Sequence, residues 1–342
     1  MSDPKEDLSV HKFSSLSRRL PPPEIGAVFI EMTSDFFRFL RISLIHCKLA
    51  RTHTTPSRNA NCDGVVFMYI GTVMVEKYNK PHLTFGDQAA QLQLRGLIIN
   101  NPDDCIGALE KIGYYRLSAY WYPFRKKKPK ASRTTPFNYR LDEFEPKHTF
   151  EEAVALYRFD ESLRRLLLEA LGVIEIQLRT KIAYFAGKQD RFIHLKRELL
   201  DPIACCRVPK NSTQDSYQIW LHKYHKQIKR AGREDFIRHY QVRYGNDIPI
   251  WIATEILDFG GVSKLFDFLP KQLKNQIALS FGAKEGTVVA GWIRNFNYIR
   301  NVSAHHSRLW NRLVITRIQA PNRNVVDPSI FHLADVKNRK SP

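Results

Sequence analysis

Residues 149–186 constrain the fold more than any other stretch of the chain. Thr149 followed by Glu152 has the spacing of a capping box, a common start of a helix. No proline interrupts the stretch, so a helix here would extend over about 50 Å at the ordinary helical rise. Apolar side chains recur every three or four positions, which predicts one long helix: Leu156, Phe159, Leu163, Leu166, Leu167, Ala170, Ile174, Leu178 and Ile182. Glu175 and Arg179, four residues apart on its flank, predict a surface salt bridge.

Other segments of the main body predict helices too. Thr84 can cap a helix that Gly96 ends, and Asn101-Pro102-Asp103 opens a second one. Apart from a short connection at 246–249, no strand-like alternation of any length occurs. The predicted fold class is therefore all-α. Its further expected helices cover residues 103–124, 216–245, 248–266 (interrupted at Gly260-Gly261) and 290–312.

The composition indicates a folded protein with a polyanionic partner. The chain has a net charge of +19, which favours nucleic acid or an acidic membrane surface. With 43% hydrophobic and 12% aromatic residues it can bury a real core, which argues against wholesale disorder. The most apolar stretch, 64–75, has 12 residues, too few for a membrane span of about 20. Neither a signal peptide nor a C-x-x-C motif is found, and the five cysteines fit a reducing cytoplasm.

The first 73 residues differ in composition and sequence pattern from the rest. They include a triple proline and a polar, turn-rich linker at 53–64. The sequence pattern changes at Met74, where the chain resembles the start of a natural protein. Residues 1–73 are therefore interpreted as an atypical extension or a mis-assigned start. The expected organisation continues with a helical N-terminal domain carrying a basic loop (74–148), a larger helical domain (149–320) and a polar tail (321–342).

An aromatic and basic segment between residues 114 and 136 is a candidate RNA-binding surface. Six of the nine residues 125–133 are basic, and they follow a tail rich in tyrosine and tryptophan. Rings can stack on bases while lysines meet phosphates, although such a run also occurs as an ordinary solvated loop. The candidate RNA-binding residues are Tyr115, Arg116, Tyr120, Trp121, Arg125, Lys126, Lys127 and Lys128.

The histidines of the chain offer no clear metal site. His222, His225 and His239 have few acidic residues and no cysteine near them, so a solvated basic face is the favoured interpretation. His305 and His306 are adjacent, and on a helix they would point apart, unlike the i, i+4 pair of a zinc helix. We therefore expect no metal and no cofactor.

A helix over 290–312 would have two faces. Trp292, Phe296, Ile299, Ser303, His306 and Trp310 would form a mostly apolar stripe. The opposite, polar stripe would hold Arg294, Asn297, Asn301, His305 and Arg308. His305 could move a proton near neutral pH, and Arg300 could swing toward a phosphate and bind it. These are the parts needed to cleave RNA through its own 2′-OH, although an R-x4-H spacing also occurs by accident.

At these residues the sequence resembles a known family. The stretch "RNVSAHHSRLWNR" is similar to the R-x4-6-H signature of HEPN ribonucleases, in the form typical of abortive-infection (Abi, AbiD/AbiF-like) bacterial defence proteins. Segments such as "KIGYYRLSAYWYPFR" and "PIWIATEILDFGGVSKLF" resemble the same family, and the likeness runs from about Lys80 to about Arg312. It implies a helical HEPN-type bundle over 149–320, preceded by a smaller helical N-terminal domain.

The resemblance also implies an activity and a site. It implies a metal-independent endoribonuclease with Arg300 and His305 as catalytic residues, and Asn301, His306, Asn297 and Arg308 in support. Two protomers would meet as a homodimer at their motifs. The implied role is phage defence or toxicity, and it leaves room for a neutralising antitoxin or small RNA.

Two other functions compete with this one. A non-catalytic RNA-binding or regulatory protein could use the same basic surface, and a helical oligomerisation module could carry the charge for solubility alone. Loss of cleavage with retained RNA binding in His305→Ala separates the ribonuclease from the non-catalytic RNA-binding protein. Absence of any salt-sensitive RNA binding would favour the oligomerisation module.

Overall fold

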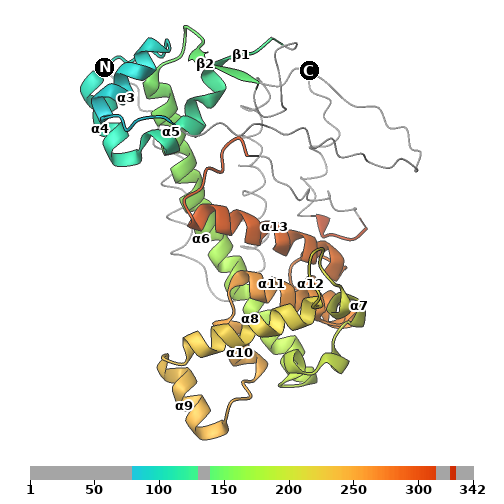
Figure 1. The fold of residues 1–342 in the computed structure, drawn as a ribbon. Helices are drawn as coiled ribbons and strands as arrows, with labels where there is room; N and C mark the ends of the chain where they lie inside the picture. The colour runs from blue at the N-terminus through green and yellow to red at the C-terminus, as the bar shows by residue number, and fades with distance from the viewer. Residues whose placement is uncertain (1–78, 130–138, 313–323, 329–342) are drawn as a thin grey trace, which may run out of the picture. The chain divides into compact units, whose positions relative to one another are not determined.

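The computed structural model describes residues 79–129, 139–312 and 324–328 (Figure 1). Eleven α-helices and one two-stranded sheet lie in these ranges, which confirms the predicted all-α class. The expected extension 1–73, the expected start at Met74 and most of the expected tail 321–342 lie outside the described residues. No helix in these ranges is long and apolar enough to cross a membrane.

The predicted long helix is confirmed as α6 (Phe150–Gln189), a single helix of 40 residues. Its start is the expected capping box, in which the N–H of Glu152 donates to Thr149 Oγ1 at 3.1 Å and the N–H of Thr149 donates to Glu152 Oε2 at 3.2 Å. Contacts divide the described chain into two units inside this helix. Residues up to Leu163 belong to the N-terminal unit, and residues from Arg164 onward belong to the C-terminal unit.

The N-terminal unit begins with helices whose starts the sequence predicts. Thr84 caps the first of them with a capping box to Asp87, and Asn101 caps the second by accepting from the N–H groups of Asp103 and Asp104. The unit consists of α3 (Phe85–Leu94), α4 (Pro102–Ile112), α5 (Tyr114–Trp121), the 3-10 turn η2 (Tyr122–Phe124), β1 (Arg125–Lys127), β2 (Arg140–Phe144) and the first turns of α6.

Two predictions for this unit are wrong. The expected continuous helix 103–124 is broken at Gly113, whose φ of 94° is a left-handed value that favours glycine. The start of the expected basic loop is a strand, because Arg125–Lys127 pairs antiparallel with Arg140–Phe144. A strand of three charged residues lacks the alternation by which a strand is found in a sequence.

The core of the C-terminal unit lies among its later helices. The last helix, α13 (Gly286–Ala304), packs against α11 (Phe259–Phe268) and α12 (Lys271–Leu279). Helix α8 (Ser216–Ala231) packs against α7 (Pro202–Cys206), α10 (Ile250–Ile256) and α11. Gly286 lets α13 begin close to α12, because a Cβ at this position would lie 2.4 Å from the Cβ of Lys274. The other elements after α6 are η4 (Ile193–Leu195), η5 (Arg197–Leu199) and α9 (Asp235–Tyr244).

Helix breaks in the C-terminal unit differ from those expected. The predicted helix 216–245 is two helices, since α8 ends at Ala231 and α9 begins at Asp235. The interruption expected at Gly260-Gly261 instead falls at Asp258, whose side chain caps α11 by accepting from the N–H of Gly261 at 2.6 Å.

Part of the expected polar tail belongs to this unit. The N–H of Lys284 donates to the carbonyl of Val325, and the N–H of Asp327 donates to the carbonyl of Gly282, each at 2.8 Å. Val326 between them is buried.

Candidate active site

Helix α13 carries most of the predicted site. Trp292, Phe296, Ile299 and Ser303 are buried on one face, as the helical spacing predicts. Asn297, Arg300 and Asn301 are partly exposed, and Arg294 is exposed. Burial of the apolar stripe anchors α13 in the core and leaves the polar side chains at its edge.

The helix does not continue to residue 312, so that prediction is wrong. His305 is the C-cap of α13. The N–H of His306 donates to the carbonyl of Ser303 at 3.1 Å, and the N–H of Ser307 donates to the carbonyl of Val302 at 3.0 Å. This pair of bonds is a Schellman arrangement, which closes a helix end and requires a left-handed residue just beyond the cap. His306 takes that position with a φ of 53°.

The helix end changes the roles expected for the histidines. Both His305 and His306 are exposed. The prediction that His306 shares the apolar stripe with Trp310 is wrong, because helical spacing does not apply beyond Ala304. For the same reason Arg308 does not continue the polar stripe; it is half-buried beyond the helix end.

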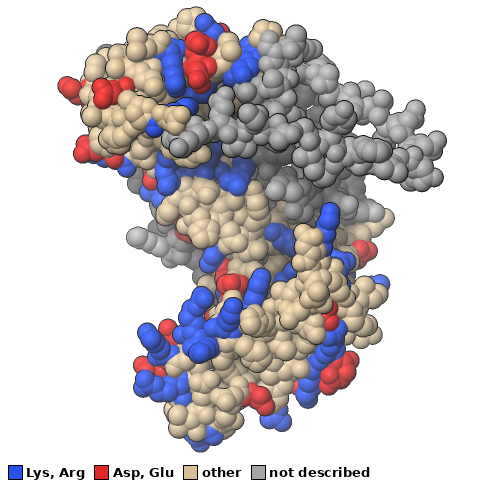
Figure 2. All heavy atoms as spheres, viewed as in Figure 1, with Lys and Arg blue, Asp and Glu red and all other residues tan. Residues whose placement is uncertain are grey.

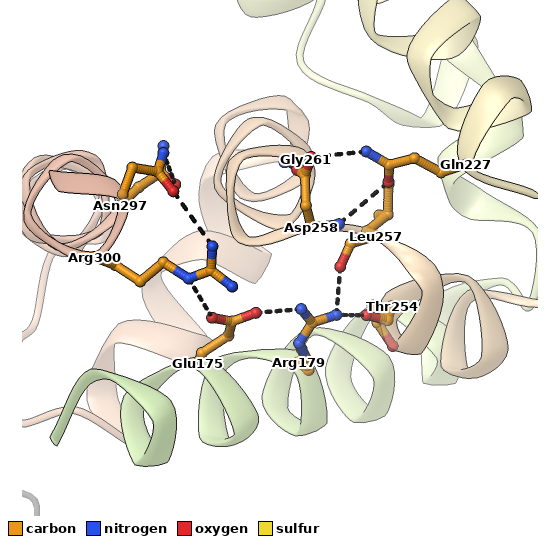
Figure 3. A network of polar contacts seen from close by, with 10 residues as sticks. Glu175, Arg179, Gln227, Thr254, Leu257, Asp258, Gly261, Asn297 and Arg300 are labelled. Atoms are coloured by element: carbon orange, nitrogen blue, oxygen red, sulfur yellow. Dashed lines mark hydrogen bonds and ion pairs between the residues drawn. The ribbon is translucent and has the colours of Figure 1, made fainter. Parts of the chain in front are cut away.

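Arg300 is held by a carboxylate on another helix. Figure 3 shows Arg300 extending from α13 toward Glu175 on α6, and Arg300 Nε lies 3.7 Å from Glu175 Oε2. The second oxygen of Glu175 accepts from Arg179. The side chains of Glu175 and Arg179 are only 14% and 12% exposed. The expected surface salt bridge is therefore a largely buried pair, and its carboxylate also pairs with Arg300.

Arg179 and Arg300 differ in what they can still bind. Arg179 also donates to the backbone carbonyls of Thr254 and of Leu257, the latter at 2.6 Å, at the C-terminal end of α10 (Figure 3). A carboxylate and two carbonyls thus enclose the Arg179 guanidinium. The Arg300 side chain is 37% exposed. An anion from solution can therefore approach Arg300, whereas Arg179 serves to hold Glu175 in place.

Two asparagines of the polar stripe support Arg300 from its own helix. Arg300 Nη1 donates to Asn301 Oδ1 at 3.4 Å, and Asn301 Nδ2 donates to Asn297 Oδ1 at 3.3 Å. Asn297 also lies close to α11, because a Cβ on Gly260 would be 3.6 Å from Asn297 Nδ2. The structure thus brings together three of the predicted site residues, Arg300, Asn301 and Asn297.

The candidate RNA-binding residues of the N-terminal unit divide into two groups. Tyr115 is 92% exposed, and Arg116, Lys126 and Lys127 are exposed as well. Arg125 and Lys128 are half-buried, and Arg125 Nη1 lies 2.9 Å from Asp142 Oδ1.

Tyr120 and Trp121 do not lie on the predicted RNA-binding surface, so that prediction is wrong for both. Their exposed fractions are 1% and 0%, so neither ring can stack on a base. The Tyr120 hydroxyl donates to Asp160 Oδ2 at 2.6 Å in the buried interior. These rings face inward because α5 packs with α4 and with the start of α6, where Trp121 approaches Phe150 at 6.0 Å between ring centroids.

The histidines of α8 and α9 do not form a metal site. His222, His225 and His239 are all exposed. Within the described ranges, no group of three His, Cys, Asp or Glu side chains is arranged to hold a metal ion.

The contact of Glu175 and Arg179 with the site on α13 is not predicted by the sequence pattern. Each directly follows a buried residue of α6, Ile174 or Leu178, and so lies at the edge of the apolar stripe. A charged i, i+4 pair at that edge is a signal that another helix covers it. The identity of that helix could not be found from the spacing within α6.

Comparison with known proteins identifies the family. No curated protein and no solved structure matches the chain. Residues 107–311, more than half of the 342 residues, match a family model described as Abi-like protein. The match includes α5, the whole of α6 and the site on α13. This chain belongs to the Abi-like protein family.

Proposed function

We propose that this protein is a metal-independent endoribonuclease that acts in the cytoplasm in abortive infection, as a phage-defence effector or a toxin. The observation that carries the proposal is the placement of a partly exposed guanidinium, Arg300, and an exposed imidazole, His305, at the same end of α13. Membership of the Abi-like family supports the defence role. The AbiD/AbiF-like subtype and the HEPN nature of the helical bundle are part of the proposal.

The proposed reaction uses the RNA's own hydroxyl. The neutral imidazole of His305 accepts the proton of a ribose 2′-OH, and the oxygen attacks the adjacent phosphorus. The bond from phosphorus to the 5′ oxygen of the next nucleotide breaks, and that oxygen takes up a proton. The products are a 2′,3′-cyclic phosphate and a 5′-OH end. Arg300 stabilises the negative charge that develops on the phosphate oxygens.

Glu175 has a defined part in this proposal. The Glu175 carboxylate orients the Arg300 guanidinium. Arg179 holds the second oxygen of Glu175 and so keeps this carboxylate directed toward Arg300. An arginine held in one direction loses less side-chain freedom when it binds a phosphate than a freely moving one. Asn297 and Asn301 support the same orientation from α13.

We also propose a homodimer in which two copies meet at their motifs. His305 lies past the last helical residue, whereas Arg300 is directed toward α6, so a second copy would bring an imidazole to each guanidinium. Light scattering should give twice the monomer mass. A monomer with full cleavage activity would contradict this part of the proposal.

The chemistry of the product ends tests the reaction directly. Purified wild-type protein and His305→Ala are incubated with single-stranded RNA, with and without EDTA, and the new 5′ and 3′ ends are identified. Wild type should yield 5′-OH and cyclic phosphate ends whether or not EDTA is present, and folded His305→Ala should yield almost none. Products with 5′-phosphate ends, or abolition by EDTA, would refute the mechanism.

One observation favours a second candidate, a non-catalytic RNA-binding or regulatory protein. The ion pair with Glu175 offsets part of the charge that Arg300 would otherwise present to a phosphate. In that case wild type and His305→Ala would bind RNA equally and neither would cleave it.

A further inference from the structure

The exposed side of α8 carries a group of positive charges that the proposed reaction does not use. Lys223, Lys226, Lys229 and Arg230, here called the α8 basic face, are all exposed. No interaction with another described residue is found for any of the four. Residues 216–231 contain no Asp or Glu. In Figure 2, blue side chains gather over the part of the surface where Figure 1 shows α8.

The stability of α8 does not explain these charges. The helix is held by its opposite side, where Tyr217, Trp220, Tyr224 and Ile228 are buried. Cations in the last turn favour a helix through its dipole, which accounts for Lys229 and Arg230 only. Lys223 and Lys226 lie nearer the middle, and like charges three or four residues apart repel one another. A bound polyanion would relieve this repulsion.

Contacts connect α8 with the candidate active site. Gln227 lies on the same flank as Lys223 and Arg230, at spacings of four and three residues. Gln227 Nε2 donates to Asp258 Oδ2 at 2.9 Å, and its Oε1 accepts from the N–H of Asp258 at 3.2 Å (Figure 3). Asp258 caps α11, whose Gly260 lies against Asn297 in the active-site cluster. Because α11 packs against both α8 and α13, the α8 basic face lies near the helix that carries Arg300.

We infer that the α8 basic face binds backbone phosphates of the single-stranded RNA that is cleaved at Arg300 and His305. This inference rests on the proposed function. From Lys223 to Arg230 the charges extend about 10 Å along the helix axis, a line that suits a chain of phosphates better than one isolated anion. Lysines bind phosphates as point charges without reading sequence, so this face positions the strand and does not select bases.

The test measures RNA binding in a background that cannot cleave. In His305→Ala protein, the four residues of the α8 basic face are changed to Gln, and binding of a labelled single-stranded RNA is followed by fluorescence anisotropy at several salt concentrations. A matched control changes four exposed lysines elsewhere to Gln: Lys111, Lys147, Lys210 and Lys271. Both variants lose the same net charge. A double variant, Lys223→Gln with Lys226→Gln, serves if the fourfold variant does not fold.

We expect the α8 variant to raise the Kd about tenfold or more and to reduce the salt slope by about 3, because each lost phosphate contact on a single strand contributes about 0.7. The double variant should give about half that change in slope, and the control should leave the slope near that of the parent. Equal weakening in both fourfold variants would overturn the inference, since it would indicate net charge alone. So would unchanged RNA binding with loss of binding to phosphatidylserine vesicles.

The outcome can be separated from that of the proposed function. If wild type does not cleave RNA but binds it through α8, the ribonuclease proposal fails and the binding face stands. If wild type cleaves RNA and the α8 variant binds it like its parent, the inference about α8 fails alone.

Discussion

The end of α13 and the segment from α5 to β1 have similar compositions, with arginine and aromatic rings in each, and the sequence predicts RNA contacts for both. In the first, Arg300 and both histidines remain accessible while Trp292 and Phe296 of α13 are buried. In the second, two of the three rings expected to stack on bases, Tyr120 and Trp121, are core residues, and only Tyr115 is exposed. Composition indicates a partner in both cases. Only the direction of each side chain decides which residues can reach that partner.

The two regions also differ in how their charges are held. Arg300 is directed by a partly buried carboxylate that a second arginine fixes in place. Lys126 and Lys127 are exposed on a short strand. An oriented charge suits a reacting phosphate, whereas exposed lysines suit general attraction of a polyanion. The following experiments would break or sharpen this contrast.

Trp121→Ala should have the largest effect, and the effect should be on stability. Removing a fully buried tryptophan leaves a cavity, so we expect the free energy of unfolding to fall by about 3–5 kcal/mol. Urea denaturation measures this, with the exposed Tyr115→Ala as the control that should change stability by less than about 0.5 kcal/mol. A stable Trp121→Ala protein with weakened RNA binding would remove the contrast between the two regions.

Arg300→Ala should lower RNA cleavage by about 10² or more, the usual scale for loss of electrostatic stabilisation. Arg294→Ala, on the same helix and paired with Asp267, is the matched control and should cleave like wild type. Initial rates on a labelled single-stranded RNA measure both. Equal rates in the two variants would mean that the arginine held by Glu175 has no special role.

A buried histidine should make the stability of the protein depend on pH, unlike the exposed histidines at the end of α13. His194 is fully buried, and burial lowers its pKa to about 4. The unfolded chain takes up a proton below about pH 6.5 and the folded one only near 4, so the free energy of unfolding should fall across that window by up to about 3 kcal/mol. The lowered pKa values of Asp87, Asp190, Asp201 and Asp215 reduce stability mainly below their ordinary value of 3.8, so only the onset of this loss falls at the acid end of the window.

Two variants test whether His194 causes this pH dependence of stability. Chemical denaturation between pH 7 and 4 should show a flatter profile for His194→Gln, whereas exposed His305→Gln should keep the wild-type profile. An unchanged profile in His194→Gln would refute the assignment.

Glu175→Gln should lower the free energy of unfolding by about 1–3 kcal/mol, because two arginines lose their shared, largely buried carboxylate. Exposed Glu169→Gln on the same helix is the matched control, with an expected change below about 0.5 kcal/mol. The two melts are compared directly. If Glu175→Gln is as stable as the control, the pair is no more than the surface salt bridge that the sequence predicts.

At His306 the smallest effect is expected, as a difference between two variants. A left-handed backbone costs about 1–2 kcal/mol for a residue with a Cβ, so His306→Gly should be more stable than His306→Ala by about that amount. Thermal unfolding of both variants measures it. Equal stabilities would argue against the Schellman end of α13.

The sequence by itself determined the features that depend on near neighbours in the chain. The all-α class, the capped start of α6, the N-caps at Thr84 and Asn101 and the buried stripe of α13 follow from spacing and local hydrogen bonding. Arg300 and His305 are predicted as site residues from a short motif. Such features need only a few consecutive residues, and these are what periodicity and capping rules describe.

Tertiary structure alone decided which side chains meet across the fold. Glu175 and Arg300 are far apart in sequence, and they meet because α6 and α13 belong to the same unit of the fold. Packing of α5 against α4 and the start of α6 buried Tyr120 and Trp121, and the end of α13 at Ala304 exposed both histidines. Burial is a property of the whole packed core, so helical spacing assigns a side chain to a face but cannot say what covers that face.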